Sequence, residues 1–245
     1  MTEPMTPIAD LHARRGEEAR HSDAARTMFE RIAPTYDVLN RLLSAGIDER
    51  WRARAIVELS RAPAGPVLDL CAGTLDLTAR VAAVRPRDRV VAVDFSAAML
   101  EAGRRKAPQA ELVVADATKL PFEGASFAAV VCGFGMRNLG DLRKGAAEVL
   151  RVLRPGGAFV TLEFFRPSRW ATRAFHGAYA RVVLPAVGGL VSGDRGAYRY
   201  LARSMGGFLS RPEYEAMLGD LGFSRVRGYD LTLGVSSIVV AEAGA

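Results

Sequence analysis

The sequence predicts an α/β protein with a mostly parallel sheet covered by helices on both faces. Between residues 67 and 163, short apolar runs alternate with helical spacing, which is typical of successive strand and helix units. The runs are apolar almost throughout, as expected for parallel strands buried on both sides. With 245 residues, 49% hydrophobic and 24% charged, the chain can bury a large core. We therefore expect a loosely ordered arm over 1–22 and one domain over 23–245.

An N-terminal helical cap is expected before the sheet. From Asp23 the apolar spacing predicts short helices interrupted at Pro34, and the helical pattern continues to a Pro- and Gly-containing breaker at 62–66. Strands are then expected at Val67–Leu70, Arg89–Asp94, Glu111–Ala115, Ser126–Cys132 and Ala158–Glu163. The intervening helices carry apolar positions from Leu77, an N-cap at Ser96, and a span from Asp141 to Val152 that ends before Arg154-Pro155-Gly156-Gly157.

The alternation stops over residues 166–209, an Arg- and aromatic-rich stretch that is interpreted as an insertion. Its mixture of arginines and large apolar side chains suits contact with a hydrophobic acceptor or with a membrane interface. The stretch can equally be interpreted as a lid helix packed on the sheet. A helix at Glu213–Leu221 and two strands at Phe223–Leu231 and Val235–Ala241, joined near Gly234, complete the predicted domain.

Composition argues against several classes of protein. The longest strongly apolar stretch, 182–191, has ten residues, whereas a membrane-spanning helix needs about twenty. Without an apolar signal segment at the N-terminus, the expected compartment is the cytoplasm. Two cysteines, Cys71 and Cys132, lack the spacing of a disulfide framework or a zinc site, so no metal is predicted. The net charge of +6 comes from scattered arginines, so nucleic-acid binding is not expected.

The first strand-to-helix turn is the expected ligand site, because ligands bind at the carboxyl ends of strands in an open α/β sheet. It reads Asp69-Leu70-Cys71-Ala72-Gly73-Thr74-Leu75-Asp76. Gly73 lets the backbone approach a ligand, and Thr74 supplies a hydroxyl near a helix N-terminus. The turn lacks G-x-G-x-x-G, which argues against a dinucleotide. A plain tight turn is the alternative interpretation.

Two later strand ends extend this site. Asp94 ends the second strand, where a carboxylate can accept hydrogen bonds from both hydroxyls of a ribose. Asp116 and Ala117 follow the third strand, where a carboxylate beside an apolar surface can accept from an adenine amino group. Each aspartate alone is also compatible with a solvated loop. Together with the first turn, they predict a pocket for an adenosyl ligand.

Longer motifs point to a family. They include M-F-E-R-I-A-P-T-Y-D at 28–37, F-G-M-R-N at 134–138, R-P-G-G at 154–157 and D-R-G-A-Y-R-Y-L at 194–201. With these motifs the sequence resembles, from about Met28 to Gly234, the S-adenosylmethionine-dependent ubiquinone/menaquinone biosynthesis C-methyltransferases, the UbiE family. General methyltransferases share the first turn and the R-P-G-G corner, but not the F-G-x-R-N and D-x-x-x-Y-R-Y-L blocks in this order.

The resemblance implies a class I methyltransferase fold, with a seven-stranded sheet whose last strand is reversed. It also implies S-adenosylmethionine as cofactor and a small-molecule prenylated quinol, such as demethylmenaquinol, methylated on a ring carbon. Cofactor contacts are implied at Thr74, Asp94, Asp116, Ala117 and Gly133, to which the first turn adds Asp69 and Gly73.

The chemistry restricts what the acceptor site must do. A sulfonium methyl is already electrophilic, so the acceptor carbon must be aligned and made electron-rich, which the loss of a phenolic proton achieves. Arg137 is predicted to hold a water, a carboxylate or the phenolate, while Asn138, Tyr36, Tyr198 and Glu163 are candidates to orient the ring or relay the proton. The alternatives are that Arg137 and Asn138 only brace their loop and that Tyr198 is a core residue. No histidine falls on a motif, which disfavours an imidazole base.

Three departures from the family pattern keep alternatives open. Leu75 stands where relatives have glycine, so the backbone there is expected to do without a positive φ or to be adjusted nearby. Ser204-Met205-Gly206 replaces Ser-Ile-Arg, and Val235-Ser236-Ser237 replaces a more apolar stretch that ends in histidine. Another phenolic or secondary-metabolite acceptor is the alternative substrate, and a non-catalytic binding subunit is the alternative class. A homodimer and peripheral contact with the inner membrane face also stay open.

Overall fold

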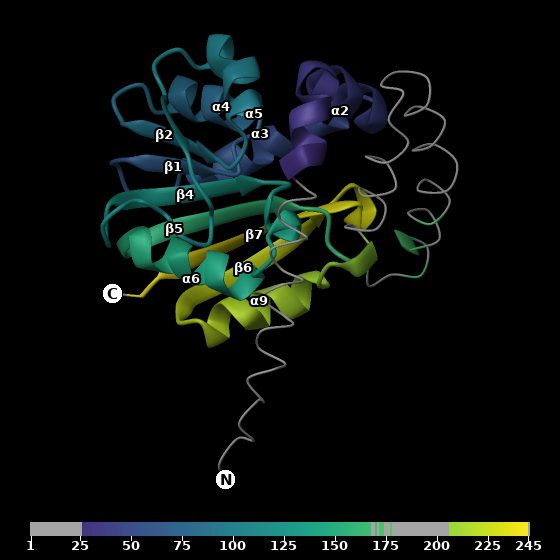
Figure 1. The fold of residues 1–245 in the computed structure, drawn as a ribbon. Helices are drawn as coiled ribbons and strands as arrows, with labels where there is room; N and C mark the ends of the chain where they lie inside the picture. Colours follow the sequence, from purple (N-terminus) through teal and green to yellow (C-terminus); the bar gives the residue numbers. More distant parts are fainter. Residues whose placement is uncertain (1–25, 168–169, 171, 174–176, 178–205, 245) are drawn as a thin grey trace, which may run out of the picture.

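The computed structural model describes residues 26–167, 170, 172–173, 177 and 206–244. Within them the chain forms a seven-stranded sheet (Figure 1). Its strands are β1 (Val67–Leu70), β2 (Val90–Asp94), β3 (Glu111–Val114), β4 (Phe127–Gly133), β5 (Leu153–Glu163), β6 (Phe223–Leu231) and β7 (Ser236–Ala243). The order is β3-β2-β1-β4-β5-β7-β6, and β7 runs antiparallel to both of its neighbours while the pairs from β3 to β5 are parallel. The predicted reversed last strand is therefore confirmed.

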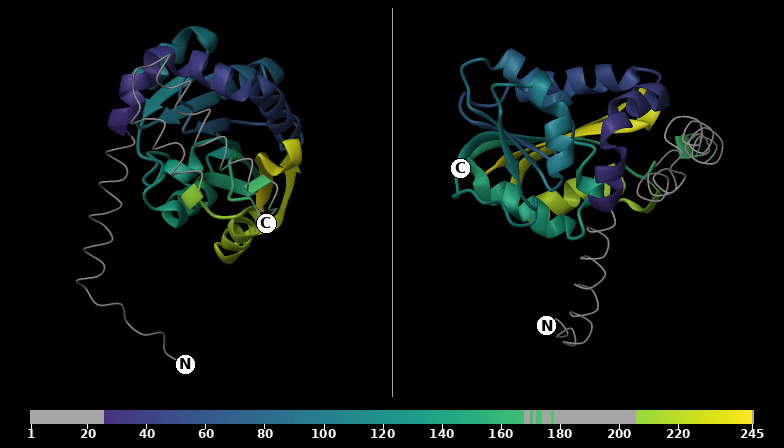
Figure 2. Two further views of the ribbon diagram at one scale, coloured as in Figure 1. Left: turned by 90° about the vertical axis from the view of Figure 1, so that its right-hand side faces the viewer. Right: turned by 45° about the horizontal axis from the view of Figure 1, so that its top comes forward.

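Helices cover both faces of the sheet, as Figures 1 and 2 show. They are α2 (Tyr36–Ser44), α3 (Ile47–Leu59), α4 (Asp76–Val84), α5 (Ala97–Gly103), α6 (Leu142–Val152) and α9 (Arg211–Asp220), with 3-10 turns η1 (Ala33–Thr35), η2 (Arg104–Lys106), η3 (Met136–Asn138) and η4 (Thr232–Gly234). In Figure 1, α3, α4 and α5 lie above the sheet and α6 and α9 lie below it. Residues 26–32 are also helical, and η1 contains Pro34, where the break in the N-terminal cap is predicted.

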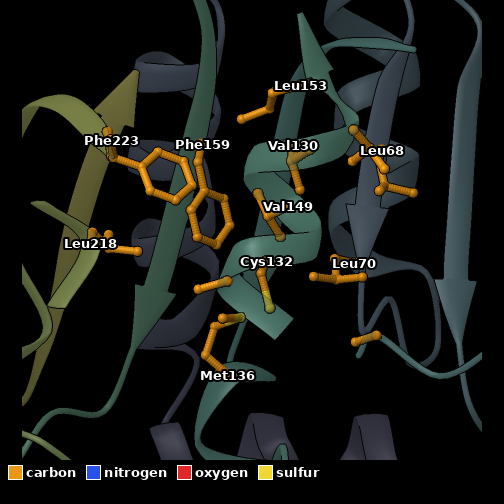
Figure 3. Close-up of a cluster of buried hydrophobic side chains, with 14 of the residues drawn as sticks. Leu68, Leu70, Val130, Cys132, Met136, Val149, Leu153, Phe159, Leu218 and Phe223 are labelled. Carbon is orange, nitrogen blue, oxygen red and sulfur yellow. The ribbon is translucent and has the colours of Figure 1, made fainter. Parts of the chain in front are cut away.

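The core consists of two apolar layers, one on each face of the sheet. Below the sheet, Val149 of α6 and Leu218 of α9 pack on Leu68, Val130 and Phe159 of the central strands (Figure 3). Above the sheet, a second set joins α3 and α4 to the same strands and includes Trp51, Leu59, Val81, Ala129 and Val160. Both faces of β1 are buried, which explains why its sequence is apolar without alternation.

Helix starts match their sequence signals. Ser96 accepts a hydrogen bond from Met99 N at 3.3 Å, and Asp141 caps α6 by accepting from Lys144 N at 2.9 Å. At α9, Ser210 and Glu213 form a reciprocal capping box. These local bonds satisfy N–H groups that have no partner inside the helix.

The fifth strand differs from its prediction. The turn expected at 154–157 is part of β5, and the register with β4 jumps from the pair Phe127 and Leu153 to the pair Ala129 and Ala158. Gly156 takes a φ of 72° inside this irregularity. The Pro- and Gly-containing corner is therefore a bulge within a strand.

Several predictions concern residues outside the described part. The arm over 1–22, most of the insertion over 166–209 and Tyr198 belong to this group. Among the helices that the structure describes, none has both the length and the apolar character needed to cross a bilayer.

Candidate active site

A cavity of about 320 Å³ lies at the carboxyl ends of the parallel strands. Its wall includes Gly73 after β1, Asp94 at the end of β2, Asp116 after β3 and Gly133 at the end of β4. The N-terminal segment completes the wall with Arg26, Phe29 and Tyr36. This is the place where the crossover connections of an open α/β sheet leave room for a ligand.

The first turn contains three residues with left-handed backbone: Cys71 at φ 56°, Gly73 at φ 54° and Leu75 at φ 66°. Leu75 was expected to do without a positive φ or to have the backbone adjusted nearby, and the first of these alternatives is wrong. Its side chain is fully buried in a cluster with Ala92 and Leu100, so tertiary packing holds a conformation that a residue with a Cβ disfavours. The turn keeps the form that glycine would give it.

Asp94 connects the end of β2 to this turn. Its Oδ2 accepts from Gly73 N and its Oδ1 from Ser96 N, both at 2.9 Å. Burial raises the pKa of the Asp94 carboxyl to about 6, although the backbone hydrogen bonds favour the charged form. Asp94 is 5% exposed and lines the cavity. A buried carboxylate with free lone pairs is thereby presented to a ligand at the strand end.

Two predicted cofactor residues lie behind the cavity wall instead of on it. Asp69 is 1% exposed, and its Oδ2 accepts from Thr78 Oγ1 at 2.6 Å. Its Oδ1 has no hydrogen-bond partner among the residues that the structure describes. Burial raises the pKa of Asp69 to about 7. Thr74 is 3% exposed, and its hydroxyl donates to Asp37 at 2.5 Å. The cavity is lined by the other five: Gly73, Asp94, Asp116, Ala117 and Gly133.

Gly133 has a steric reason to lack a side chain. A Cβ at this position would lie 2.5 Å from Leu77 Cδ1 of α4. A side chain at this position would therefore displace Leu77.

The F-G-x-R-N loop after β4 is held by its own side chains. Phe134 has a φ of 59°, and its carbonyl accepts from Arg137 Nη1 at 2.5 Å and from Asn138 Nδ2 at 3.1 Å. Arg137 Nη1 also lies 2.6 Å from Glu163 Oε1, and the guanidinium stacks over Phe164. These contacts match the bracing interpretation of Arg137 and Asn138.

The residues predicted to act on the acceptor therefore separate into two groups. Tyr36 and Asn138 line the cavity, whereas Arg137 and Glu163 are buried behind its wall. Burial raises the pKa of the Tyr36 hydroxyl, and the nearby charges of Arg137 and Arg52 oppose that rise only in part. Their roles in catalysis stay predictions.

Sequence reasoning missed two aromatic residues of the wall. Phe29 meets Tyr36 and Phe95 edge-on, with ring centroids 6.0 and 6.1 Å apart. Both Phe29 and Phe95 line the cavity. A signal was present for each, because Phe29 belongs to the motif at 28–37 and Phe95 directly follows Asp94.

The sheet order, the reversed β7 and the cavity at the strand ends define a class I methyltransferase fold. Solved structures share it: a SAM-dependent methyltransferase from Thermotoga maritima gives a TM-score of 0.66, at 16% identity, over 89% of this chain and 99% of that one. A chain from the complex of the Haloferax volcanii Trm112 methyltransferase activator with a methyltransferase gives 0.65, also at 16% identity, over 89% and 98%. At such identities the likeness shows the fold alone.

The chain belongs to the ubiE/COQ5 methyltransferase family, whose model matches residues 17–242. It is 46% identical to a demethylmenaquinone methyltransferase of Thermus thermophilus, over 88% of this chain and 99% of that protein. It is 42% identical to a ubiquinone/menaquinone biosynthesis C-methyltransferase of Syntrophotalea carbinolica, over 91% and 95%. The predicted family and fold class are confirmed, and the protein is a methyltransferase.

Proposed function

We propose that this methyltransferase transfers a methyl group from S-adenosylmethionine to a ring carbon of a prenylated quinol such as demethylmenaquinol. The observation that carries the proposal is the strand-end cavity, which is lined by a buried carboxylate at Asp94 and by Tyr36 and Asn138. Relatives of 42–46% identity that are named for this chemistry match nearly the whole chain. Similarity over nearly the whole length of these relatives supports a shared reaction.

The cavity residues fit an adenosyl cofactor. Asp94 offers carboxylate oxygens to ribose hydroxyls, and Asp116 with Ala117 offers an acceptor beside an apolar surface for the base. Gly73 and Gly133 leave the backbone open to close approach. When bound, the cofactor supplies a sulfonium methyl that is electrophilic without further activation.

The acceptor must be oriented and made electron-rich. Because burial raises its pKa, the Tyr36 hydroxyl stays protonated near neutral pH and can donate a hydrogen bond to an acceptor oxygen. Asn138 lines the same cavity and carries an amide. The positive charges of Arg137 and Arg52, which lower the pKa of Tyr36, favour an anionic oxygen in the same region. An ionised quinol oxygen pushes electron density onto the ortho carbon, which would form a C–C bond to the methyl group as the S–CH3 bond breaks. The ring hydrogen would then leave that carbon as a proton, which restores the aromatic quinol.

The test is mass-spectrometric detection of methyl transfer to demethylmenaquinol, supplied in reduced and in oxidised form. We expect a ring-methylated product from the reduced form alone, because only the quinol can lose a phenolic proton. An analogue without the prenyl tail is the comparison, and turnover of the analogue at the full rate would favour the alternative phenolic acceptor. Binding of S-adenosylmethionine without product from either form would contradict the quinol assignment.

We also propose contact with a membrane surface, since a prenylated acceptor resides in a bilayer. Trp170 and Leu233 are both 81% exposed, and Thr172 Oγ1 donates to the Leu233 carbonyl at 2.7 Å, which joins their two segments. Exposed Trp and Leu are suited to the interface between lipid and water. The substitutions Trp170→Ala and Leu233→Ser should each reduce co-sedimentation with anionic vesicles. Val84→Ser, which changes an exposed valine on α4, should not.

A further inference from the structure

The N-terminal helices form a wall of the cavity although they precede the sheet in the chain. Phe29 and Tyr36 come from this segment and line the cavity together with residues of β2 and β4. In the right-hand view of Figure 2 the segment, drawn in purple, spans the space between the two helical layers. The shape of the cavity therefore depends on where these helices are held.

Asp37, the residue after Tyr36, joins the segment to two other parts of the protein. Its Oδ1 accepts from Thr74 Oγ1 of the first turn at 2.5 Å. Its Oδ2 lies 2.5 Å from Lys106 Nζ of η2. Lys106 also binds Asp76 Oδ1, at the start of α4, at 2.6 Å. We call Asp37, Thr74, Lys106 and Asp76 the latch.

The partners of Asp37 are of two kinds. Thr74 is 3% exposed, so its hydroxyl needs a protein acceptor, and Asp37 provides one. The side chains of Asp37 and Lys106 are 43% and 30% exposed, so their ion pair alone contributes little. The two contacts of Asp37 matter together, because one carboxylate fixes the position of α2 relative to both the first turn and η2.

We infer that Asp37 is a positioning residue of the cofactor site, which holds the N-terminal helices against the first turn through Thr74 and Lys106. The inference rests on the proposed function for the identity of the cofactor. It reassigns Thr74, whose hydroxyl is bound to Asp37 and does not line the cavity. Thr74 then affects the cofactor through the position of the helices and not through direct contact.

None of the four latch residues lines the cavity, which gives a distinctive expectation. If its loss leaves the wall in place for only a tenth of the time, the apparent Kd rises about tenfold, and by the same factor for every ligand that needs the wall. We therefore expect Asp37→Ala and Thr74→Val to weaken S-adenosylhomocysteine and 5′-methylthioadenosine equally in calorimetry. The second ligand lacks the amino-acid portion, so a direct contact between Thr74 and that portion would affect only the first.

The double variant and a matched control sharpen the test. Asp37→Ala/Thr74→Val should bind no more weakly than Asp37→Ala alone, because Asp37→Ala already removes the contact that Thr74→Val removes. Arg41→Ala removes an ion pair between α2 and Glu49 of α3 and leaves the latch intact, so its affinity should equal that of the wild type. Unchanged affinity in both single variants, a loss confined to S-adenosylhomocysteine, or additive losses would each overturn the inference.

A measurement without ligand separates this inference from the proposed function. Amide hydrogen exchange over residues 26–44 should be faster in Asp37→Ala and Thr74→Val than in the wild type, and equal exchange would overturn the latch. If Asp37→Ala does not fold, Thr74→Val alone breaks the hydrogen bond to Asp37 and replaces it in both experiments. A wild type that binds neither ligand would contradict the proposed function, while the exchange rates would still decide whether the latch exists.

Discussion

Arg137 and Glu163 form an ion pair closed off from solvent, with Nη1 2.6 Å from Oε1 and side chains 5% and 0% exposed. Glu163 also accepts from the backbone N–H of Arg137 at 3.2 Å and from that of Phe164 at 2.7 Å. The pair thus joins the loop after β4 to the end of β5. Its position explains how a loop with a left-handed phenylalanine keeps one conformation next to the cavity.

Breaking this pair should cost stability as well as activity. Arg137→Met leaves the buried Glu163 charge without its positive partner, and we expect a loss of about 3–5 kcal/mol in the free energy of unfolding. Arg137→Met/Glu163→Leu removes both charges and should recover most of that loss. Methyl transfer should stay low in the double variant, because the positive charge near Tyr36 is gone. Urea unfolding and product formation measure the two effects, and a single variant as stable as the wild type would contradict a bracing role.

The pKa of Asp94 predicts how cofactor binding depends on pH. The carboxylate accepts hydrogen bonds from ribose hydroxyls more strongly when charged, and its pKa is about 6. Affinity for S-adenosylhomocysteine should therefore increase as the pH rises through that value and decrease as it falls. Asp94→Asn should bind about tenfold or more weakly at neutral pH and show little dependence on pH. Calorimetry from about pH 5 to about pH 8 checks this prediction. If the affinity of Asp94→Asn depends on pH as strongly as that of the wild type, the assignment of Asp94 to the ribose is wrong.

The sequence was sufficient where structure is decided by local pattern. The five parallel strands follow from apolar runs between turn residues, and Ser96 and Asp141 cap helices as their residue types indicate. Gly73, Asp94 and Asp116 could be placed around one cavity because the carboxyl ends of parallel strands share an edge of the sheet.

The sequence was insufficient where the conformation of a residue depends on contacts between segments that are distant in the chain. The hydrogen bond from Thr74 to Asp37 joins residues 37 positions apart, and no local pattern reveals it. The placement of Arg137 behind the wall depends on Glu163, 26 positions later. At Leu75, packing against Leu100 overrides the preference of the backbone, which single-residue propensity could not show.

Asp69 should make the protein less stable as the pH rises. Its pKa of about 7 in the folded protein lies above the ordinary value of 3.8, so the unfolded chain releases this proton at lower pH. The stabilising effect of the protonated form is complete below about pH 4 and is lost as the pH rises through about 7, by a few kcal/mol. Asp69→Asn cannot ionise, so its stability relative to the wild type should be greater at about pH 8 than at about pH 5. Urea unfolding at both pH values measures the stability of the variant relative to the wild type. The same stability difference at both pH values would contradict a buried, proton-binding Asp69.

Leu75 sets backbone strain against burial, and the magnitudes decide which prevails. Leu75→Gly relieves a left-handed conformation that costs about 1–2 kcal/mol, but it removes a fully buried side chain whose truncation typically costs about 2–5 kcal/mol. We expect a net loss of about 1–3 kcal/mol, because the cavity left among Ala92 and Leu100 outweighs the relief. Leu75→Ala loses the same packing and keeps the strain, so it should be less stable than Leu75→Gly by about 0.5–1 kcal/mol. Urea unfolding of the two variants beside the wild type separates the terms. If Leu75→Gly is more stable than the wild type, backbone strain outweighs burial. If Leu75→Ala is at least as stable as Leu75→Gly, the turn relaxes once the leucine side chain is gone.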